Sequence, residues 1–333
     1  MTHTERVEAV LRGAPVDRLP VSFWRHFYLA ERTPQGLAQS MLYFWRRYQW
    51  DFLKVNPRAT YQAEAWGTQP KYGADEHSGE ELAEWPVKRT SDWASIKPVS
   101  PAARPLAEQL EALERIKRGL DGGCLFIETV SSPLSTLGML AGGPDRVKED
   151  IVEAPEAVHN ALGAVTETLG AFVEEVLKVA DGIFYATTIW AASEHLTPRL
   201  YEEFGRPYDL QVLSHAQSAR LNILHVCQSH NFVRDLMDYP THVVHWDVYA
   251  PGNPDLLDVA KLTDKVLMGG VDGARVLRVA RPAEVRAHIE SLIAGEKPAK
   301  FIVGAGCVVD THTPDDNLMT VKTVLAGQEE APA

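Results

Sequence analysis

The sequence predicts an α/β protein with the architecture of a (β/α)8, or TIM, barrel that carries an extended cap between its second and third strands. Two observations lead to this prediction. Short runs rich in β-branched and aromatic residues recur eight times, and most of the intervals between them have helical periodicity, as in residues 144–180 and 282–295. Parallel strands that are covered on both faces read as continuous apolar runs, which is the pattern of these segments.

The predicted strands are, in chain order, residues 18–24, 51–56, 124–130, 182–188, 221–227, 242–247, 265–271 and 300–306. The connection after the second strand, residues 57–120, is rich in Trp, Pro and charged residues and is longer than a βα loop needs. We interpret it as a cap over the barrel mouth. Residues 1–330 are predicted to form one domain, because no linker divides the chain and only the tail 327–333 is of low complexity.

Composition and charge exclude several classes of protein. The chain has 333 residues, of which 45% are hydrophobic and 23% charged, and no apolar run approaches the roughly 18 residues that a membrane helix needs. The first 13 residues are charged and amphipathic, unlike a secretory signal, so we expect a cytoplasmic protein without a membrane partner. The net charge of -12 argues against nucleic acid as a partner.

The three cysteines are too few for a disulfide framework, and in a reducing compartment they are expected to be core residues, nucleophiles or metal ligands. Cys124 begins the third predicted strand, Cys227 ends the fifth, and Cys307 follows the eighth. His225 precedes Cys227 by two residues in "LNILHVCQSH". Catalytic groups of such barrels lie at the carboxyl ends of the strands, so His225, Cys227 and Cys307 are predicted to face one mouth.

One imidazole and two thiolates suit Zn²⁺, and three protein ligands leave a fourth position for substrate. The sequence therefore predicts a catalytic zinc site made by His225, Cys227 and Cys307, which are both the metal ligands and the catalytic residues. A purely structural interpretation is also open, in which the thiols fill the core and the imidazole is only hydrogen-bonded. The small residues of "GAGC", residues 304–307, could equally serve packing or a phosphate site.

Four further residues are weaker candidates for substrate binding. Arg25 could bind an anionic group such as a sulfonate or carboxylate, or pair with an acid. Glu128 could be a fourth ligand or contact a ligand, or form a salt bridge. Asp247 could orient His225 by accepting its second ring proton, as metal-bound histidines usually require. Tyr185 could line the pocket or pack in the core.

Other residues near these strand ends have structural interpretations that are at least as plausible. Trp190 could line the pocket, although core packing is the simpler interpretation. His245 alternates with apolar neighbours in a strand and is predicted to be structural. His230 and His312 could compete as ligands, but loop solvation is the simpler expectation. The tryptophans of the cap could recognise an aromatic methyl ether or a protein partner, or could anchor the core.

Several segments of the chain resemble the uroporphyrinogen decarboxylase superfamily. They are "TERVEAVLRGAPVDRLPV" (4–21), "HLTPRLYEEFGRPY" (195–208), "LMGGVDGARVL" (267–277) and "GAGCVVDTHTPDDNL" (304–318). The resemblance extends over nearly the whole chain, and several motifs together are more specific than any one. The superfamily contains cofactor-free decarboxylases of tetrapyrrole acetates and zinc-dependent methyltransferases, and its members are (β/α)8 barrels.

The chain is most similar to the zinc-dependent corrinoid and coenzyme M methyltransferase branch. That branch carries a His-x-Cys after the fifth strand and a distant Cys after the eighth, which match His225, Cys227 and Cys307. The resemblance implies that the chain moves a methyl group between a corrinoid protein and a small-molecule thiol or methylated donor. It also implies zinc as cofactor and a corrinoid (cobalamin) carried on a partner protein. The sequence leaves the oligomeric state open, a homodimer included.

The decarboxylase branch is matched less well. Its N-terminal signature holds substrate carboxylates with two arginines, whereas "FWRHFYLAER" offers only Arg25 for the first of them. Its aspartate after the second strand faces "VNPRAT" here, where no carboxylate stands. Decarboxylation of a tetrapyrrole or another polycarboxylate is therefore the alternative function, and a non-catalytic binding or scaffold barrel is a third interpretation.

Overall fold

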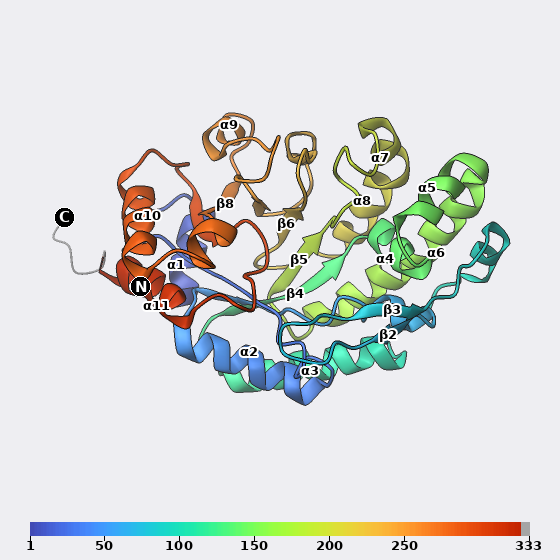
Figure 1. Cartoon of the computed structure of the whole chain (residues 1–333), viewed down its shortest axis with the longest axis horizontal. Helices are drawn as coiled ribbons and strands as arrows, with labels where there is room; N and C mark the ends of the chain where they lie inside the picture. Colours follow the sequence, from blue (N-terminus) through green and yellow to red (C-terminus); the bar gives the residue numbers. More distant parts are fainter. Residues whose placement is uncertain (328–333) are drawn as a thin grey trace.

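Seven parallel strands form one curled sheet in the order β1-β4-β5-β6-β7-β8-β9, with helices around its outer side (Figure 1). The computed structural model describes residues 1–327. Residues 328–333, which include most of the predicted low-complexity tail and the end of the predicted domain, lie outside the described residues. Within the described range, no helix is both long and apolar enough to cross a membrane.

The strands of the curled sheet are β1 (Phe52–Lys54), β4 (Leu125–Ser131), β5 (Gly182–Ala186), β6 (Ile223–Val226), β7 (Val243–Trp246), β8 (Val266–Val271) and β9 (Phe301–Ala305). All neighbours pair in parallel, from β1 against β4 to β8 against β9. A separate antiparallel hairpin consists of β2 (Gln69–Lys71) and β3 (Glu81–Glu84). Seven of the eight predicted strands are thus confirmed.

The helices alternate with these strands. They are α1 (His3–Leu11), α2 (Pro34–Tyr48), α3 (Arg104–Leu120), α4 (Pro133–Leu140), α5 (Pro144–Glu153), α6 (Pro155–Leu177), α7 (Pro198–Phe204), α8 (Arg206–Ser214), α9 (Leu256–Ala260), α10 (Pro282–Ala294) and α11 (Asp315–Ala326). Short turns of 3-10 or π type are η1 (Ala63–Trp66), η2 (Thr90–Ser95), η3 (Val233–Leu236) and η4 (Gly273–Leu277). Many of the helices begin with Pro in the first turn, where the missing N–H costs nothing.

The predicted first strand, residues 18–24, forms only a single parallel bridge, between Val21 and Val303. The Val303 N–H donates to the Pro20 carbonyl at 2.8 Å, and the Asp51 N–H donates to the Val21 carbonyl at 2.8 Å. This segment therefore lies between β9 and the start of β1 as extended backbone. Pro20 has no N–H to contribute to a ladder, which explains why an eighth strand does not develop.

The connection predicted to be a cap is only partly separate from the barrel. Its last part is α3, which packs against α2 in the outer helical layer at the bottom of Figure 1. The rest contains η1, the β2–β3 hairpin and η2. Residues 57–61 reach the cavity at the strand ends, and the proposal that the remainder covers the mouth stays a prediction.

Alternation along the strands decides which side chains face the barrel interior. Phe184 and Ala186 of β5 join Ile223, Met268 and Ile302 in an inner apolar cluster. Tyr185, between them, belongs to the larger cluster that lies between the sheet and the helices. Because the side-chain period of a strand is two, this register sends alternate residues of each strand end either into the mouth or against the helices.

A buried carboxylate holds the segment before β1 in place. Asp51 is fully buried and accepts hydrogen bonds from Arg6 at 2.6 Å, Arg18 at 2.7 Å and the Val21 N–H at 2.8 Å. Burial alone would raise the pKa of Asp51, but the hydrogen bonds from His3 and Arg18 and the nearby guanidinium charges lower it below its usual 3.8. The carboxylate thus connects α1, the extended segment and β1.

We expect Asp51→Asn to lower the free energy of unfolding by about 3–5 kcal/mol, because it removes the charge that two buried guanidinium groups share. Urea titration measures this change. Glu111→Gln, which breaks only the exposed Arg115 pair, is the control and should leave the urea midpoint nearly unchanged.

Because the folded pKa of Asp51 is lowered, its stabilisation is present above pH 3.8 and lost as the pH falls through the folded value. The difference in unfolding free energy between wild type and Asp51→Asn should therefore shrink in acid. A difference that stays constant down to the acid transition would contradict this assignment.

Candidate metal centre

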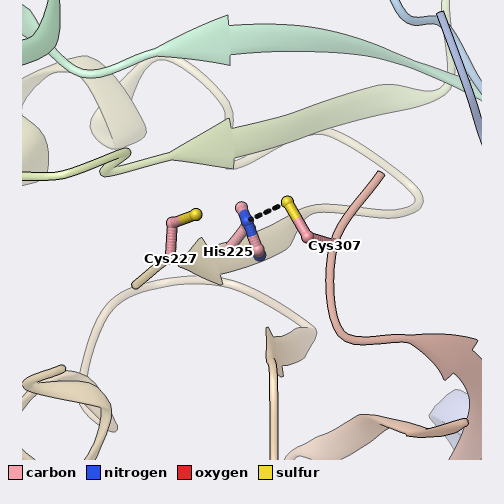
Figure 2. Close-up of side chains that lie close together, drawn as sticks. All are labelled: His225, Cys227 and Cys307. Atoms are coloured by element: carbon pink, nitrogen blue, oxygen red, sulfur yellow. Dashed lines mark hydrogen bonds between the residues drawn. The ribbon is translucent and has the colours of Figure 1, made fainter. Parts of the chain in front are cut away.

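Three side chains from two distant parts of the chain converge at the carboxyl ends of the strands. His225 lies in β6, Cys227 directly follows β6, and Cys307 follows β9 (Figure 2). One donor atom from each lies within 4.8 Å of the other two, and His225 Nε2 is 3.6 Å from Cys307 Sγ. Within residues 1–327 this is the only such group of three or more His, Cys, Asp or Glu side chains. Their role as metal ligands stays a prediction.

The local backbone explains how the thiols reach this place. Gln228, immediately after Cys227, has a φ of 71°, a left-handed conformation that turns the chain away from β6. Gly306, immediately before Cys307, lies so close to Asp247 that an added Cβ would be 2.3 Å from the Asp247 carboxyl carbon. Only glycine allows the chain after β9 to approach the end of β7 in this way.

The two thiols differ in their affinity for a proton. The hydrogen-bonding interaction with Cys227 holds the pKa of Cys307 well below its usual 9.0. The same interaction, together with burial, raises the pKa of Cys227. Of the two thiols, Cys307 is therefore the more readily deprotonated. One imidazole nitrogen and two thiols that a cation can deprotonate are a donor set that fits Zn²⁺.

A cavity of about 190 Å³ opens beside these donors. Its apolar wall includes Trp24, Phe184 and Ile189. Its polar wall includes Lys54, Asn56, Arg58, Tyr61, Thr129 and Ser131, and His26 also lines it. The three converging side chains thus share a small, mainly apolar space with a few polar groups, which is the usual character of a small-molecule site.

Lys54, at the end of β1, is a buried cation in this cavity. Its Nζ donates to Asn56 Oδ1 and lies 4.6 Å from the ring centroid of Phe184 and 5.3 Å from that of Trp24. Burial lowers the pKa of Lys54 to about 7. Asn56 Nδ2 is buried and has no hydrogen-bond partner among the described residues. Two donors, one ammonium and one amide, are therefore directed to the same small region.

His26 and Glu31 form a second polar pair at the cavity. His26 Nδ1 lies 3.0 Å from Glu31 Oε1, and Glu31, which is 1% exposed, also accepts the Phe27 N–H at 2.9 Å. The imidazole stacks on Tyr28 with 4.8 Å between ring centroids. Since a carboxylate accepts, His26 donates from Nδ1. Its Nε2 makes no hydrogen bond within residues 1–327.

Two of the predicted substrate-binding residues face away from the cavity. Glu128 lies on the outer face of β4, where Gln109 donates to both of its oxygens at 3.0 Å and burial raises its pKa to about 8. Tyr185 lies on the outer face of β5 and donates to Asp209 at 2.7 Å. The prediction had the strand ends right but the face wrong, because neighbouring positions of a strand point in opposite directions.

The other two predicted residues, Arg25 and Asp247, are also not among the residues that line the cavity. Arg25 stacks its guanidinium on Phe27 and Phe44, at 4.9 and 5.9 Å. Asp247 lies beside Gly306 and accepts the Tyr249 N–H at 2.9 Å, and burial raises its pKa. It does not accept from His225, whose Nδ1 contacts another histidine.

The remaining candidates also have structural surroundings. Trp190 is buried in the larger core cluster, as its packing interpretation predicts. His312 stacks on His77 at 3.9 Å outside the cavity. His230 is not in the converging group, and its ring lies against Gly252.

The sequence interpretation missed His26, Glu31, Lys54 and Asn56. A signal was present for two of them, because Lys54 and Asn56 continue the alternation of Phe52 along the second predicted strand. A charged residue at an inward position of a buried strand is unusual and marks a functional site. Nothing in the local sequence pairs His26 with Glu31.

Comparison with known proteins identifies the family. A family model described as uroporphyrinogen decarboxylase (URO-D) matches residues 2–325. The chain belongs to the uroporphyrinogen decarboxylase family. Among curated proteins, uroporphyrinogen decarboxylases from Xanthomonas oryzae pv. oryzae and Xanthomonas euvesicatoria pv. vesicatoria are 30% identical over 104 residues. The match covers 30% of this chain and only 29% of the length of those relatives.

Solved structures agree on the architecture of this family member. A methyltransferase from Methanosarcina mazei has a TM-score of 0.85 at 16% identity, covering 98% of this chain and 99% of that one. A B12-independent methionine synthase from a Shewanella species has a TM-score of 0.58 at 12% identity, covering 95% and 94%. At these identities the likeness shows the fold, a TIM-barrel-like α/β arrangement, and the function must be argued from the site.

The unequal thiols lead to a test on the metal-free protein. Iodoacetamide should alkylate Cys307 near pH 6, where an ordinary thiol is almost entirely protonated, because its pKa is held low. Cys124, whose pKa burial raises, should not react in the folded protein. Peptide mass spectrometry after timed alkylation gives the rate at each site.

The control is the same protein unfolded in urea, in which the three cysteines should react at similar rates. Faster alkylation of Cys227 than of Cys307 in the folded protein would contradict the lowered pKa of Cys307.

Proposed function

We propose that this family member is a zinc-dependent methyltransferase that moves a methyl group between a corrinoid protein and a small-molecule thiol or methylated donor. The observation that carries the proposal is the convergence of His225, Cys227 and Cys307 beside a cavity. Structural zinc sites are usually closed by four protein ligands, whereas catalytic sites keep an open position. A three-residue donor set that faces a cavity supports the catalytic type.

The donor set accounts for how zinc would be held. His225 Nε2 and the sulfurs of Cys227 and Cys307 would bind the ion and leave one position for the substrate sulfur. When bound, zinc would lower the pKa of a thiol substrate and so keep its sulfur nucleophilic at neutral pH. The protein would contribute the ligands, the orientation and a site from which water is largely excluded.

The size of the cavity supports a small substrate. About 190 Å³ is below the roughly 300–1,000 Å³ of cavities that hold drug-sized ligands. Lys54 Nζ and Asn56 Nδ2 would receive an anionic group of the substrate, the role that the sequence interpretation assigned to Arg25. An anion there would also offset the cost of burying the ammonium group.

His26 would handle the proton of the thiol. Its Nε2 would accept the proton as the sulfur becomes nucleophilic, and Glu31 would stabilise the resulting imidazolium from Nδ1. Lys54 is less suited to this role because it is enclosed, whereas the His26 side chain is 17% exposed and can pass the proton to solvent. The methyl donor would be a corrinoid carried by a partner protein at the mouth, and alignment of sulfur and methyl group would supply much of the rate.

The alternative function is decarboxylation of a tetrapyrrole or another polycarboxylate, which the names of the curated Xanthomonas relatives favour. The departures at "FWRHFYLAER" and "VNPRAT" and the position of Arg25 outside the cavity count against it. Decarboxylase activity in zinc-free protein would favour this alternative over the methyltransferase.

Zinc analysis tests the proposal most directly. Protein purified without chelators should contain about one zinc per chain, and Cys227→Ala and Cys307→Ala should each lose most of it, because two remaining ligands bind zinc weakly. Inductively coupled plasma mass spectrometry measures the content. Cys124→Ala is the matched control, since Cys124 is buried at the other end of the barrel wall, and it should keep the metal.

A second test concerns Lys54. We expect the zinc-loaded enzyme to bind 3-mercaptopropionate at least about tenfold more tightly than its neutral amide, because a charged hydrogen bond contributes about 1.5–3 kcal/mol. Lys54→Met should abolish the preference while keeping the side-chain volume. Isothermal titration calorimetry measures both affinities.

The control for Lys54 is Lys265→Met, which removes a half-buried lysine that donates to the Tyr239 carbonyl away from the cavity. It should retain the preference. Equal affinity of wild type for the two thiols would remove Lys54 from substrate binding without affecting the zinc proposal.

A further inference from the structure

His245 in β7 is a fully buried histidine with both ring nitrogens engaged. Its Nδ1 lies 2.8 Å from His225 Nδ1, and its Nε2 lies 2.6 Å from the carbonyl oxygen of Ala305. It does not line the cavity. The register of the sheet explains the contact, because His225 and His245 are paired residues of the neighbouring strands β6 and β7. Ala305 precedes Cys307 by two residues.

The hydrogen-bond partners determine which nitrogens carry protons. A carbonyl oxygen only accepts, so Nε2 of His245 must be the donor to Ala305. The ring of His245 is surrounded by Trp24 and Phe184, at 5.2 and 5.9 Å between centroids, and no carboxylate contacts it among the described residues. A charged imidazolium there would be buried without a counter-ion, so the ring is neutral and its Nδ1 is an acceptor.

The contact with His245 determines which ring nitrogen of His225 carries the proton. Since His245 Nδ1 accepts, His225 donates from Nδ1, and a neutral His225 then has its lone pair on Nε2. This is the atom that lies 3.6 Å from Cys307 Sγ. The tautomer that the two contacts impose is therefore the one whose free nitrogen faces the thiols.

We propose that His245 is a positioning residue of the metal centre: it selects Nε2 of His225 as the ligand atom and ties that ligand to the backbone that carries Cys307. The proposal rests on the zinc site proposed above. Metal-bound histidines usually donate their second N–H to a carboxylate, a carbonyl or water. Here a second imidazole stands between the ligand and the carbonyl, in the role that the sequence interpretation assigned to Asp247.

Because the His245 ring is neutral, it leaves the net charge of the proposed zinc site unchanged. Two thiolates already neutralise a divalent cation, and a carboxylate behind His225 would add a negative charge before any substrate arrives. The His245 ring orients the ligand without adding that charge. It also connects the ligand in β6 to the backbone at the end of β9.

The test compares two replacements of His245. His245→Met fills a similar volume but can neither accept from His225 Nδ1 nor donate to Ala305. His245→Gln offers an amide oxygen to accept and an amide N–H to donate, so it can restore the connection. We expect His245→Met to weaken zinc binding about 10- to 100-fold and His245→Gln to recover most of the loss, as measured by competition with a chromophoric chelator.

The matched control is His242→Met, because His242 lies just before β7 and accepts the Asn222 N–H away from the cavity. It should bind zinc as tightly as wild type. An affinity of His245→Met equal to that of wild type, or no recovery in His245→Gln, would overturn the proposal.

The tautomer itself can be read in the wild-type protein, independently of whether a variant folds. Long-range ¹H–¹⁵N spectra of histidine-labelled, metal-free protein should show His225 protonated on Nδ1 and not on Nε2, and added zinc should shift Nε2. A proton on His225 Nε2 would overturn the positioning role. Wild-type protein that binds no zinc, but shows the expected tautomer, would instead refute the proposed function and leave the hydrogen-bond assignment intact.

Discussion

The candidate site depends on the parallel register of the strands from β6 to β9. His225 and Cys227 face the interior because they are two residues apart at the end of β6, and the register from β6 through β7 and β8 places the end of β9 at the same level. A slip of one residue in any pair would turn an inward side chain against the helices. The close approach of Gly306 to Asp247 and the hydrogen bond from His245 to Ala305 fix this level at the site itself.

Buried polar groups at the mouth are only partly compensated by contacts among the described residues. Lys54 lies between two aromatic rings and donates to Asn56 Oδ1, the Asn56 amide nitrogen lacks a partner among the described residues, and the pKa of Cys307 is lowered in a mainly apolar cavity. By contrast, the buried charge of Asp51, away from the cavity, is fully matched by Arg6 and Arg18. Unmatched polar groups that gather in one cavity are the pattern expected of a binding site rather than of a core.

Much of the fold and the three converging residues could be predicted from the sequence, because buried parallel strands have a strong apolar pattern and their ends are known to meet. The pattern locates a strand end but does not say which residue there points inward, so Glu128 and Tyr185 were placed in the site although both face the helices.

Contacts between distant segments of the chain also could not be predicted from the sequence. His26 meets Glu31 through a turn, and His245 meets His225 through the sheet register, and neither pairing leaves a periodic signal. Pro20 limits the hydrogen bonding of the first predicted strand, and this effect could have been predicted from the sequence because proline has no N–H.

The distribution of charge around the site supports the proposed methyltransferase over a metal-free decarboxylase, whereas the fold does not distinguish the two. A barrel of this kind is shared with a methyltransferase and with methionine synthases at 10–16% identity, so the architecture permits several reactions. In the proposed zinc complex, two thiolates and one neutral imidazole would balance a divalent cation, and a third sulfur anion from a substrate would leave one negative charge in a mainly apolar cavity. Lys54, whose pKa responds to the charge of Cys307, is the cation in the same cavity that can offset it. A site built to hold carboxylates for decarboxylation has no need of two thiols, whereas a site that brings a thiolate to an electrophile needs both the thiol ligands and the nearby positive charge.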